Sequence, residues 1–180
     1  AESGAPLFRS AEVHTLPIGA VALSDKVALP FIEKSGEFYH GYTYSGHPAC
    51  CAAALESIAI IEEEKLVESV RSDIGPYFQK QWLALGDHGI VGEARMVGLL
   101  GALELVPSNK SRKRFPEEGK IGTFCRNASV RNGLIMRACW DRMVISPPLT
   151  ITKPEVDELI AKAKKSLDET WAHVKSEGLV

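Results

Sequence analysis

The sequence lacks the features of proteins that bind nucleic acid or span membranes. It has no excess of one charge, because 21 Lys and Arg stand against 23 Asp and Glu and leave a net charge of -2. A surface without a positive field does not attract nucleic acid or anionic membranes, so we expect neither partner. No apolar run approaches the roughly 20 residues that cross a bilayer, and we therefore expect a soluble protein.

Cysteine is scarce and shows no metal-binding spacing. The four cysteines, Cys50, Cys51, Cys125 and Cys139, form no C-x-x-C pair, and no secretory segment is recognisable ahead of them. We interpret them as reduced thiols of a cytoplasmic protein. A zinc site that combines His47 with the adjacent cysteines lacks a second ligand pair, so we expect no metal and favour small buried side chains.

Motifs that reveal chemistry by themselves are also missing. The chain has no P-loop, no G-x-G-x-x-G, no H-E-x-x-H and no G-x-S-x-G. What it does have is 180 residues, of which 45% are apolar, enough for one domain with a sizeable core or one domain plus a piece of another. Candidate sites must therefore be sought in single loops and residues.

Hydrophobic periodicity predicts helices that cover a mainly antiparallel sheet, which is a small α+β domain. Thr152 and Glu155 form a capping-box pattern at the start of the last helix. Gly75-Pro76 should interrupt the helical pattern that spans 66–85. We expect an irregular segment at 1–15, a buried strand at 18–24, helices at 46–64, 66–85, 117–131 and from 152, and strands within 95–106, 134–138 and 142–146.

The loop H-G-Y-T-Y-S-G-H-P at 40–48 concentrates hydroxyl groups between His40 and His47. It opens the helix predicted from residue 46, and the N-terminus of a helix attracts anions. The loop could therefore hold a phosphate through hydroxyl and backbone donors. On physical grounds alone, an ordinary capped turn is the favoured interpretation.

Arg137 is the second unusual feature, because its guanidinium interrupts the apolar run L-I-M-R-A-C. An arginine on such a strand either extends past the sheet edge into water or directs its planar fork at a carboxylate. The periodicity slightly favours the first alternative.

Five stretches together resemble a known family. They are L-P-I-G-A-V-A-L-S-D-K-V (16–27), the loop at 40–48, F-P-E-E-G-K-I-G (115–122), N-G-L-I-M-R-A (132–138) and S-P-P-L (146–149). In this order they resemble the C-terminal part of class III aminotransferases, most of all the omega-transaminase type.

The resemblance implies an α/β chain, the C-terminal portion of a fold type I transferase that uses pyridoxal 5'-phosphate (PLP) and works as a homodimer. It implies that Tyr42 and Thr43 bind the cofactor, that Arg137 binds the substrate carboxylate, and that an amine or omega-amino acid passes its amino group to pyruvate or another 2-oxo acid. Residues 1–45 would be an irregular lead-in and the tail of the large domain, 46–64 an interdomain helix, and 65–180 the small domain.

The sequence departs from the family where catalysis begins. Counting back to the position of the Schiff-base lysine reaches Arg9, and residues 1–15 contain no lysine. A permanently protonated guanidinium can neither form the imine nor move the proton, and Lys26 lies beyond the predicted strand. We therefore expect no catalytic residue here and an incomplete, inactive fragment; the alternative is a non-catalytic binding or dimerisation module. Trp140 stands where related sequences favour Gly.

Overall fold

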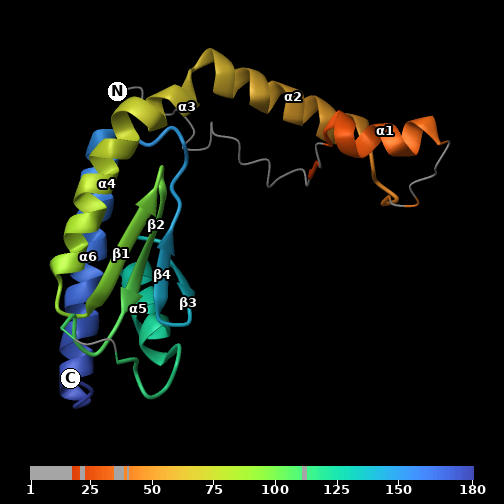
Figure 1. Ribbon diagram of the computed structural model, residues 1–180. Coiled ribbons are helices and arrows are strands. Elements are labelled where there is room, and N and C mark those ends of the chain that lie inside the picture. The colour runs from red at the N-terminus through yellow and green to blue at the C-terminus, as the bar shows by residue number, and fades with distance from the viewer. Residues whose placement is uncertain (1–17, 21–22, 35–38, 40, 111–112) are drawn as a thin grey trace. The chain divides into compact units, whose positions relative to one another are not determined.

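The computed structural model describes residues 18–20, 23–34, 39, 41–110 and 113–180 of the chain. Its contacts divide the chain into two units, Ala1–Glu64 and Lys65–Val180. The described part of the first unit holds helices α1 (Asp25–Glu33) and α2 (Pro48–Glu63). The second unit holds all the strands described, together with the remaining helices (Figure 1).

The buried strand predicted over 18–24 is wrong for the residues that the structure describes. Residues 18–20 and 23–24 belong to no strand, and Ile18 and Leu23 are 45% and 60% exposed. A strand must exchange backbone hydrogen bonds with a neighbour, and the described residues of this unit include no other strand. The irregular segment predicted at 1–15, with Arg9, lies outside the described residues.

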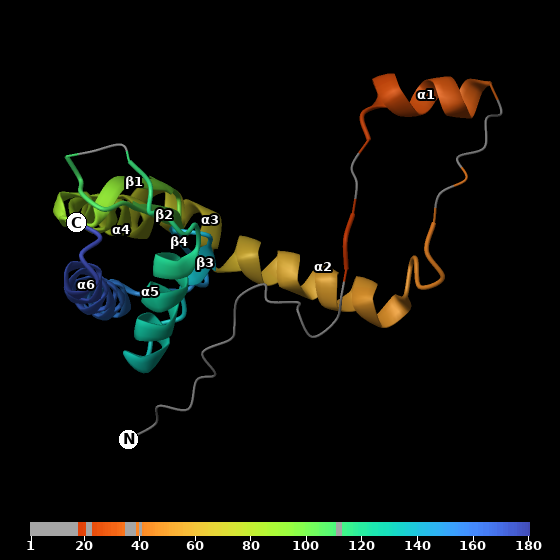
Figure 2. The same cartoon turned by 90° about the horizontal axis from the view of Figure 1, so that it is seen from below.

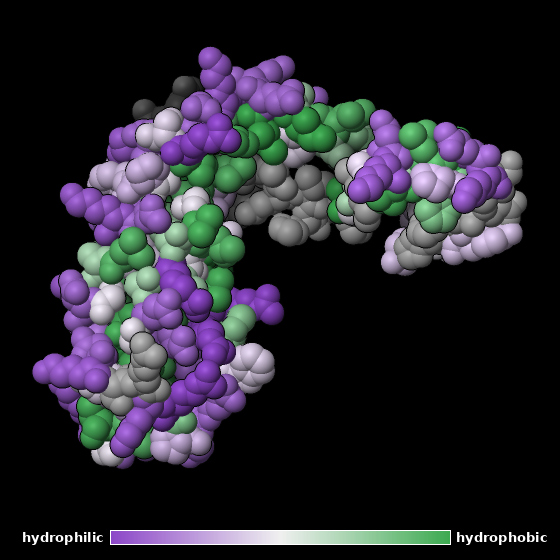
Figure 3. All heavy atoms as spheres, viewed as in Figure 1, coloured by the Kyte–Doolittle hydropathy of each residue, from purple (hydrophilic) through white to green (hydrophobic). Residues whose placement is uncertain are grey.

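Helix α2 confirms the helix predicted at 46–64. It starts at Pro48, where a missing N–H costs nothing, and runs for 16 residues. None of its residues is buried, and Leu55 and Ile58 are 69% and 54% exposed. Hydrophobic atoms accordingly gather along this helix in Figure 3. Lys65, in the left-handed conformation with φ 52°, separates α2 from the next helix.

The second unit is a four-stranded sheet with helices packed on it, which confirms the predicted α+β arrangement (Figures 1 and 2). Its strands follow the order β1-β2-β4-β3, and every neighbouring pair is antiparallel. The strands are β1 (Val91–Val97), β2 (Leu100–Leu105), β3 (Arg137–Cys139) and β4 (Arg142–Ile145).

The sheet buries one face under helices and leaves the other more open. Leu103, Leu105, Met143 and Ile145 point into the core, whereas the alternate residues are half-buried or exposed. The covering helices include α4 (Gly75–Ala84), α5 (Lys120–Arg131) and α6 (Lys153–Ser176).

The helical pattern at 66–85 is broken, as Gly75-Pro76 predicts. It divides into α3 (Leu66–Ser69), a π-helical segment η2 (Val70–Ile74), α4 and a short 3₁₀ segment η3 (Leu85–Asp87). A Cβ at Gly75 would lie 2.1 Å from the carbonyl oxygen of Val70, so only glycine fits this junction. Phe78 and Trp82 of α4 are fully buried behind the sheet.

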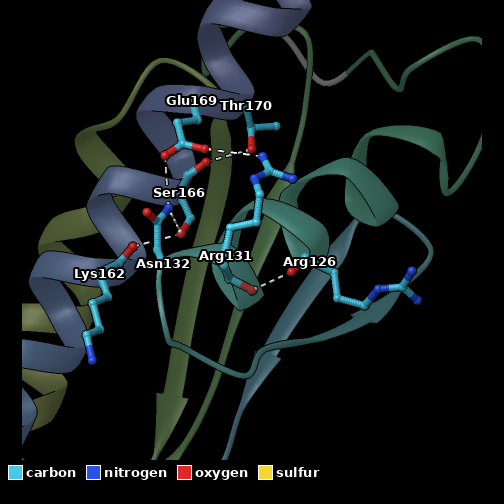
Figure 4. Close-up of polar contacts among 8 residues, drawn as sticks. Arg126, Arg131, Asn132, Lys162, Ser166, Glu169 and Thr170 are labelled. Carbon is cyan, nitrogen blue, oxygen red and sulfur yellow. Dashed lines mark hydrogen bonds and ion pairs between the residues drawn. The ribbon is translucent and has the colours of Figure 1, made fainter.

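Polar contacts join the end of α5 to α6 (Figure 4). The side-chain amide of Asn132 donates to Ser166 Oγ at 3.2 Å and to Glu169 Oε1 at 3.0 Å. Arg131 adds an ion pair with Glu169 at 3.3 Å. The hydrogen bond from Asn132 is the main reason why the pKa of Glu169 lies below its ordinary value. Asn132, the residue after the last residue of α5, thereby fixes the end of α5 to α6.

Candidate functional site

The loop at 41–47 is a hydrogen-bonded turn. The backbone N–H of Tyr42 donates to Ser45 Oγ at 3.0 Å, and the N–H of Ser45 returns to the carbonyl of Tyr42 at 2.9 Å. The Tyr42 side chain is 77% exposed, and Thr43 is exposed as well. The capped turn favoured on physical grounds is therefore present, and it engages the Ser45 hydroxyl rather than that of Thr43. His40 lies outside the described residues.

The same loop also carries donors that suit a phosphate group. It leads directly into α2, whose first residue, Pro48, has no N–H. Helical hydrogen bonding begins at Cys51, whose N–H donates to the carbonyl of His47 at 3.0 Å. The N–H groups of Ala49 and Cys50 therefore have no acceptor within the helix. Together with the exposed Thr43 hydroxyl, these groups match the donor chemistry of phosphate recognition. The residues present thus fit the phosphate end of PLP.

Arg137 begins β3, an edge strand, and its side chain is exposed on the open face of the sheet. The register aligns it with Val144, which in turn aligns with Ala102 and then Arg95. Residues aligned in this way share a face, so two half-buried apolar side chains lie between two arginines.

The two arginines of this row differ in their partners. Arg95 forms an ion pair with Glu93 at 3.4 Å. Arg137 has no ion-pair or hydrogen-bond partner for its side chain in the part of the chain that is described. Its guanidinium is available, beside apolar Val144, for a ligand that combines an anionic group with a carbon skeleton.

Exposed apolar residues flank Arg137 along the chain. Ile135 is 83% exposed and Trp140 is 62% exposed. Trp140 adopts the left-handed conformation with φ 52° in the turn between β3 and β4, a conformation that glycine adopts without strain. The next residue, Asp141, accepts two backbone hydrogen bonds from the start of α5. No local signal marks Asp141 in the sequence, because its partners Gly119 and Gly122 lie 22 and 19 positions earlier in the chain.

The predicted site residues fall in both units. Tyr42 and Thr43 share one turn in the first unit, and Arg137 belongs to the second. Lys26 is exposed in α1, and Arg9 lies outside the described residues.

The expectation of small buried cysteines holds only for Cys125. Cys51 is exposed, and Cys50 and Cys139 are half-buried. Within the described ranges, no three His, Cys, Asp or Glu side chains gather as a metal-binding group. In the same ranges, no helix has both the length and the apolar character needed to cross a membrane.

A groove of about 480 Å³ lies beside α4, η3 and α6, with His88 and Lys164 in its lining. His88 Nε2 lies 3.1 Å from Asp168 Oδ1, and His88 Nδ1 accepts the N–H of Ile90 at 3.3 Å. Both ring nitrogens are engaged in structural contacts, so this histidine is not a candidate acid or base.

Comparison with known proteins identifies the family. The model of the aminotransferase class-III family matches residues 13–167. The chain is 49% identical over 169 residues to the putrescine–pyruvate aminotransferase of Pseudomonas aeruginosa, a match that covers 94% of this chain and 37% of that protein. It is 40% identical over 163 residues to the mitochondrial gamma aminobutyrate transaminase 1 of Solanum lycopersicum, covering 89% of this chain and 32% of that protein.

Solved structures agree. The omega transaminase from Pseudomonas jessenii in complex with PMP matches with a TM-score of 0.74 and 33% identity, over 84% of this chain and 33% of that one. A structure from the directed evolution of transaminases by ancestral reconstruction matches with a TM-score of 0.74 and 42% identity, over 82% of this chain and 33% of that one.

The chain belongs to the class III aminotransferases, a PLP-dependent family. Its fold matches part of a PLP-dependent transferase of the omega-transaminase type. The chain spans about a third of the length of the relatives that it matches.

Proposed function

We propose that this chain serves a PLP-dependent aminotransferase that moves an amino group from an amine or omega-amino acid to pyruvate or another 2-oxo acid. The observation that carries this proposal is the exposed, unpartnered guanidinium of Arg137 beside the apolar Val144, within the described residues. Relatives that act on putrescine with pyruvate and on gamma-aminobutyrate support the substrate class.

Arg137 binds the carboxylate of the 2-oxo acid or omega-amino acid in this proposal. A guanidinium offers two parallel N–H groups that match the two carboxylate oxygens. Val144 and Ala102, the next residues across the sheet, offer apolar surface to the carbon chain. A carboxylate-free amine would gain nothing from the charge, so Arg137 distinguishes the two kinds of substrate.

Tyr42 and Thr43 bind the cofactor in this proposal. Thr43 donates its hydroxyl to the phosphate, the N–H groups at the start of α2 supply further donors, and Tyr42 lines the site. When bound, PLP supplies the electron sink that transamination requires. The phosphate donors of this chain hold and orient the cofactor, and none of them carries the proton that moves.

The 180 residues by themselves are inactive in this proposal. The lysine that attaches the cofactor in the family then has no counterpart, because an ungapped count back from Leu16 reaches Arg9 and residues 1–15 contain no lysine. Residues 1–45 then correspond to the tail of the large domain, 46–64 to the interdomain helix, and 65–180 to the small domain. The four free thiols suit a cytoplasmic location.

The partners that we propose are small amines and 2-oxo acids and a second copy of the chain. The exposed Leu55 and Ile58 of α2 favour self-association. They equally favour the alternative, a non-catalytic dimerisation module derived from an aminotransferase. Light scattering measures the association, and a clean monomer would contradict it. Transamination by an enzyme that joins this chain to the rest of a class III aminotransferase would favour the catalytic function, and its absence would favour the dimerisation module.

The test of the proposed function is Arg137→Ala in an enzyme that joins this chain to the rest of a class III aminotransferase. We expect kcat/KM for pyruvate to fall about a hundredfold, or ~3 kcal/mol, because a bidentate charged contact is lost. We expect kcat/KM for a carboxylate-free amine to change much less. Arg95→Ala, in the same row of the sheet but paired with Glu93, is the matched control. Equal losses for both substrates would contradict the carboxylate role.

A further inference from the structure

The turn between β3 and β4 is fastened to the start of α5 by one carboxylate. Asp141 Oδ2 accepts the N–H of Gly119 at 2.9 Å, and Oδ1 accepts the N–H of Gly122 at 2.8 Å. Both N–H groups lie at a helix N-terminus, where the intrahelical acceptors are missing and a negative charge is favoured. The backbone carbonyl of Asp141 also accepts the N–H of Leu105 at 2.8 Å.

The same turn holds an unfavourable backbone conformation in place. Trp140 has φ 52°, and its carbonyl oxygen lies so close to α5 that a Cβ at Gly122 would sit 1.8 Å from it. A bulky residue remains in the left-handed region only where its surroundings fix it. The two hydrogen bonds to the neighbouring Asp141 carboxylate provide that constraint.

The strand that depends on this turn carries Arg137. Strand β3 has three residues and, among the described strands, pairs with β4 alone. Ahead of the strand, Met136 is buried and the N–H of Leu134 donates to the carbonyl of Ser129 at 2.9 Å. Behind it, Asp141 makes the side-chain hydrogen bonds that are described between the turn and the start of α5.

We infer that Asp141 is a positioning residue for Arg137: by capping α5 it fixes the end of the edge strand from which the guanidinium projects. This inference rests on the proposed carboxylate-binding role of Arg137. The carboxylate of Asp141 then acts by holding β3 in place, and it needs no contact with the substrate.

The test compares Asp141→Asn with the unsubstituted 180-residue chain by NMR. Asparagine keeps the shape of the side chain but has one carbonyl oxygen, so it can accept only one of the two bonds. We expect amide hydrogen exchange at residues 137–145 to accelerate about tenfold, as the loss of one hydrogen bond to a charged group implies. We also expect added pyruvate to shift the Arg137 Nε–H signal in both chains, and the affinity read from this shift to be several-fold weaker in Asp141→Asn than in the unsubstituted chain. Glu158→Gln, which removes an exposed carboxylate of α6, is the control.

Unchanged exchange at residues 137–145, or equal acceleration throughout the second unit, would overturn the inference. A pyruvate affinity at Arg137 that is the same in Asp141→Asn and in the unsubstituted chain would also overturn it. The faster exchange of the strand would then have no effect on ligand binding by Arg137. If pyruvate moves no Arg137 signal even in the unsubstituted chain, the proposed carboxylate role fails. Exchange at 137–145 would still decide whether Asp141 fixes the strand.

Discussion

Trp140 pairs an exposed side chain with a backbone conformation that disfavours side chains. Its φ of 52° costs an L-residue other than glycine roughly 1–2 kcal/mol. Glycine removes that cost, but its greater conformational freedom stabilises the unfolded chain by about 0.4–1 kcal/mol. The side chain rests on Gly119, where an added Cβ would lie 3.6 Å from Trp140 Cδ1.

We predict that Trp140→Gly raises the free energy of unfolding by about 0.5 kcal/mol, because relief of the backbone strain outweighs the freedom of glycine in the unfolded chain together with the lost indole contact. Trp140→Ala should instead lower it, because alanine keeps the strain and loses the indole contact. Urea unfolding of both variants measures the difference. A glycine variant less stable than the alanine variant would show that the left-handed backbone is not the controlling factor.

Cys125 links stability to alkaline pH. The side chain is fully buried, and burial raises the pKa of its thiol from 9.0 to about 11. The unfolded chain therefore loses this proton at lower pH than the folded chain does. The stabilisation is complete below the unfolded pKa of 9.0 and is lost as pH rises toward the folded value of about 11.

We predict that raising the pH from about 8 to about 10 destabilises the unsubstituted chain by about 1 kcal/mol more than Cys125→Ala. Alanine has no thiol to ionise, so the difference isolates this group from the lysines and tyrosines. Cys51→Ala, at an exposed cysteine, should retain the full pH dependence. Identical pH profiles for the Cys125 variant and the unsubstituted chain would contradict the assignment.

Among the single elements, helix α6 begins at a capping box. The Glu155 carboxylate accepts the N–H of Thr152 at 2.8 Å and its hydroxyl at 2.7 Å. The hydroxyl contact is the first reason why the pKa of Glu155 lies below its ordinary value. This contribution to stability is therefore present above the ordinary glutamate pKa and is lost as the pH falls.

We predict that Thr152→Ala lowers the free energy of unfolding by about 1 kcal/mol, the usual effect of removing an N-cap. Thr123→Ala, at an exposed position inside α5, provides the comparison. Chemical unfolding at neutral pH measures both variants. A similar loss for the two threonines would mean that Thr152 does not act as a cap.

Local signals predicted some elements and could not predict others. The start of α6, the Asn-Gly end of α5 and the interruption near Gly75 are marked by residues within a few positions, so they are readable from the sequence. Helix α1 was missed because Pro30 lies inside it, where proline disfavours a helix. The strand expected at 18–24 failed because strands depend on partners elsewhere in the chain.

The candidate site divides in the same way. Arg137 is conspicuous in the sequence because it interrupts an apolar run. Its placement on the edge strand follows from the predicted strand at 134–138, of which the structure keeps 137–138 and adds Cys139. Arg95 has its ion-pair partner Glu93 two residues earlier on its own strand, whereas Ile135 and Cys139 stand two residues before and after Arg137. That no described residue of another element pairs with Arg137 depends on the packing of the unit and could not be read from the sequence. Asp141 has no local signal, since it acts on residues distant in sequence.

At the scale of the whole molecule, the two units carry different shares of the proposed chemistry. The turn before α2 offers donors for a phosphate, and the sheet of the second unit offers a guanidinium for a carboxylate. We propose that neither share includes the lysine that attaches the cofactor, because residues 1–15 contain no lysine. We therefore propose that these residues hold and select ligands for a transamination that the 180 residues do not perform by themselves.

The most direct test is to mix the purified 180-residue chain with PLP, reduce it with borohydride and map any adduct by peptide mass. We predict scattered labelling of surface lysines, well below one cofactor per chain, or none. One stoichiometric adduct on a single residue, for example Lys26, would contradict it, because the chain would then build a complete cofactor-attachment site without the family's lysine.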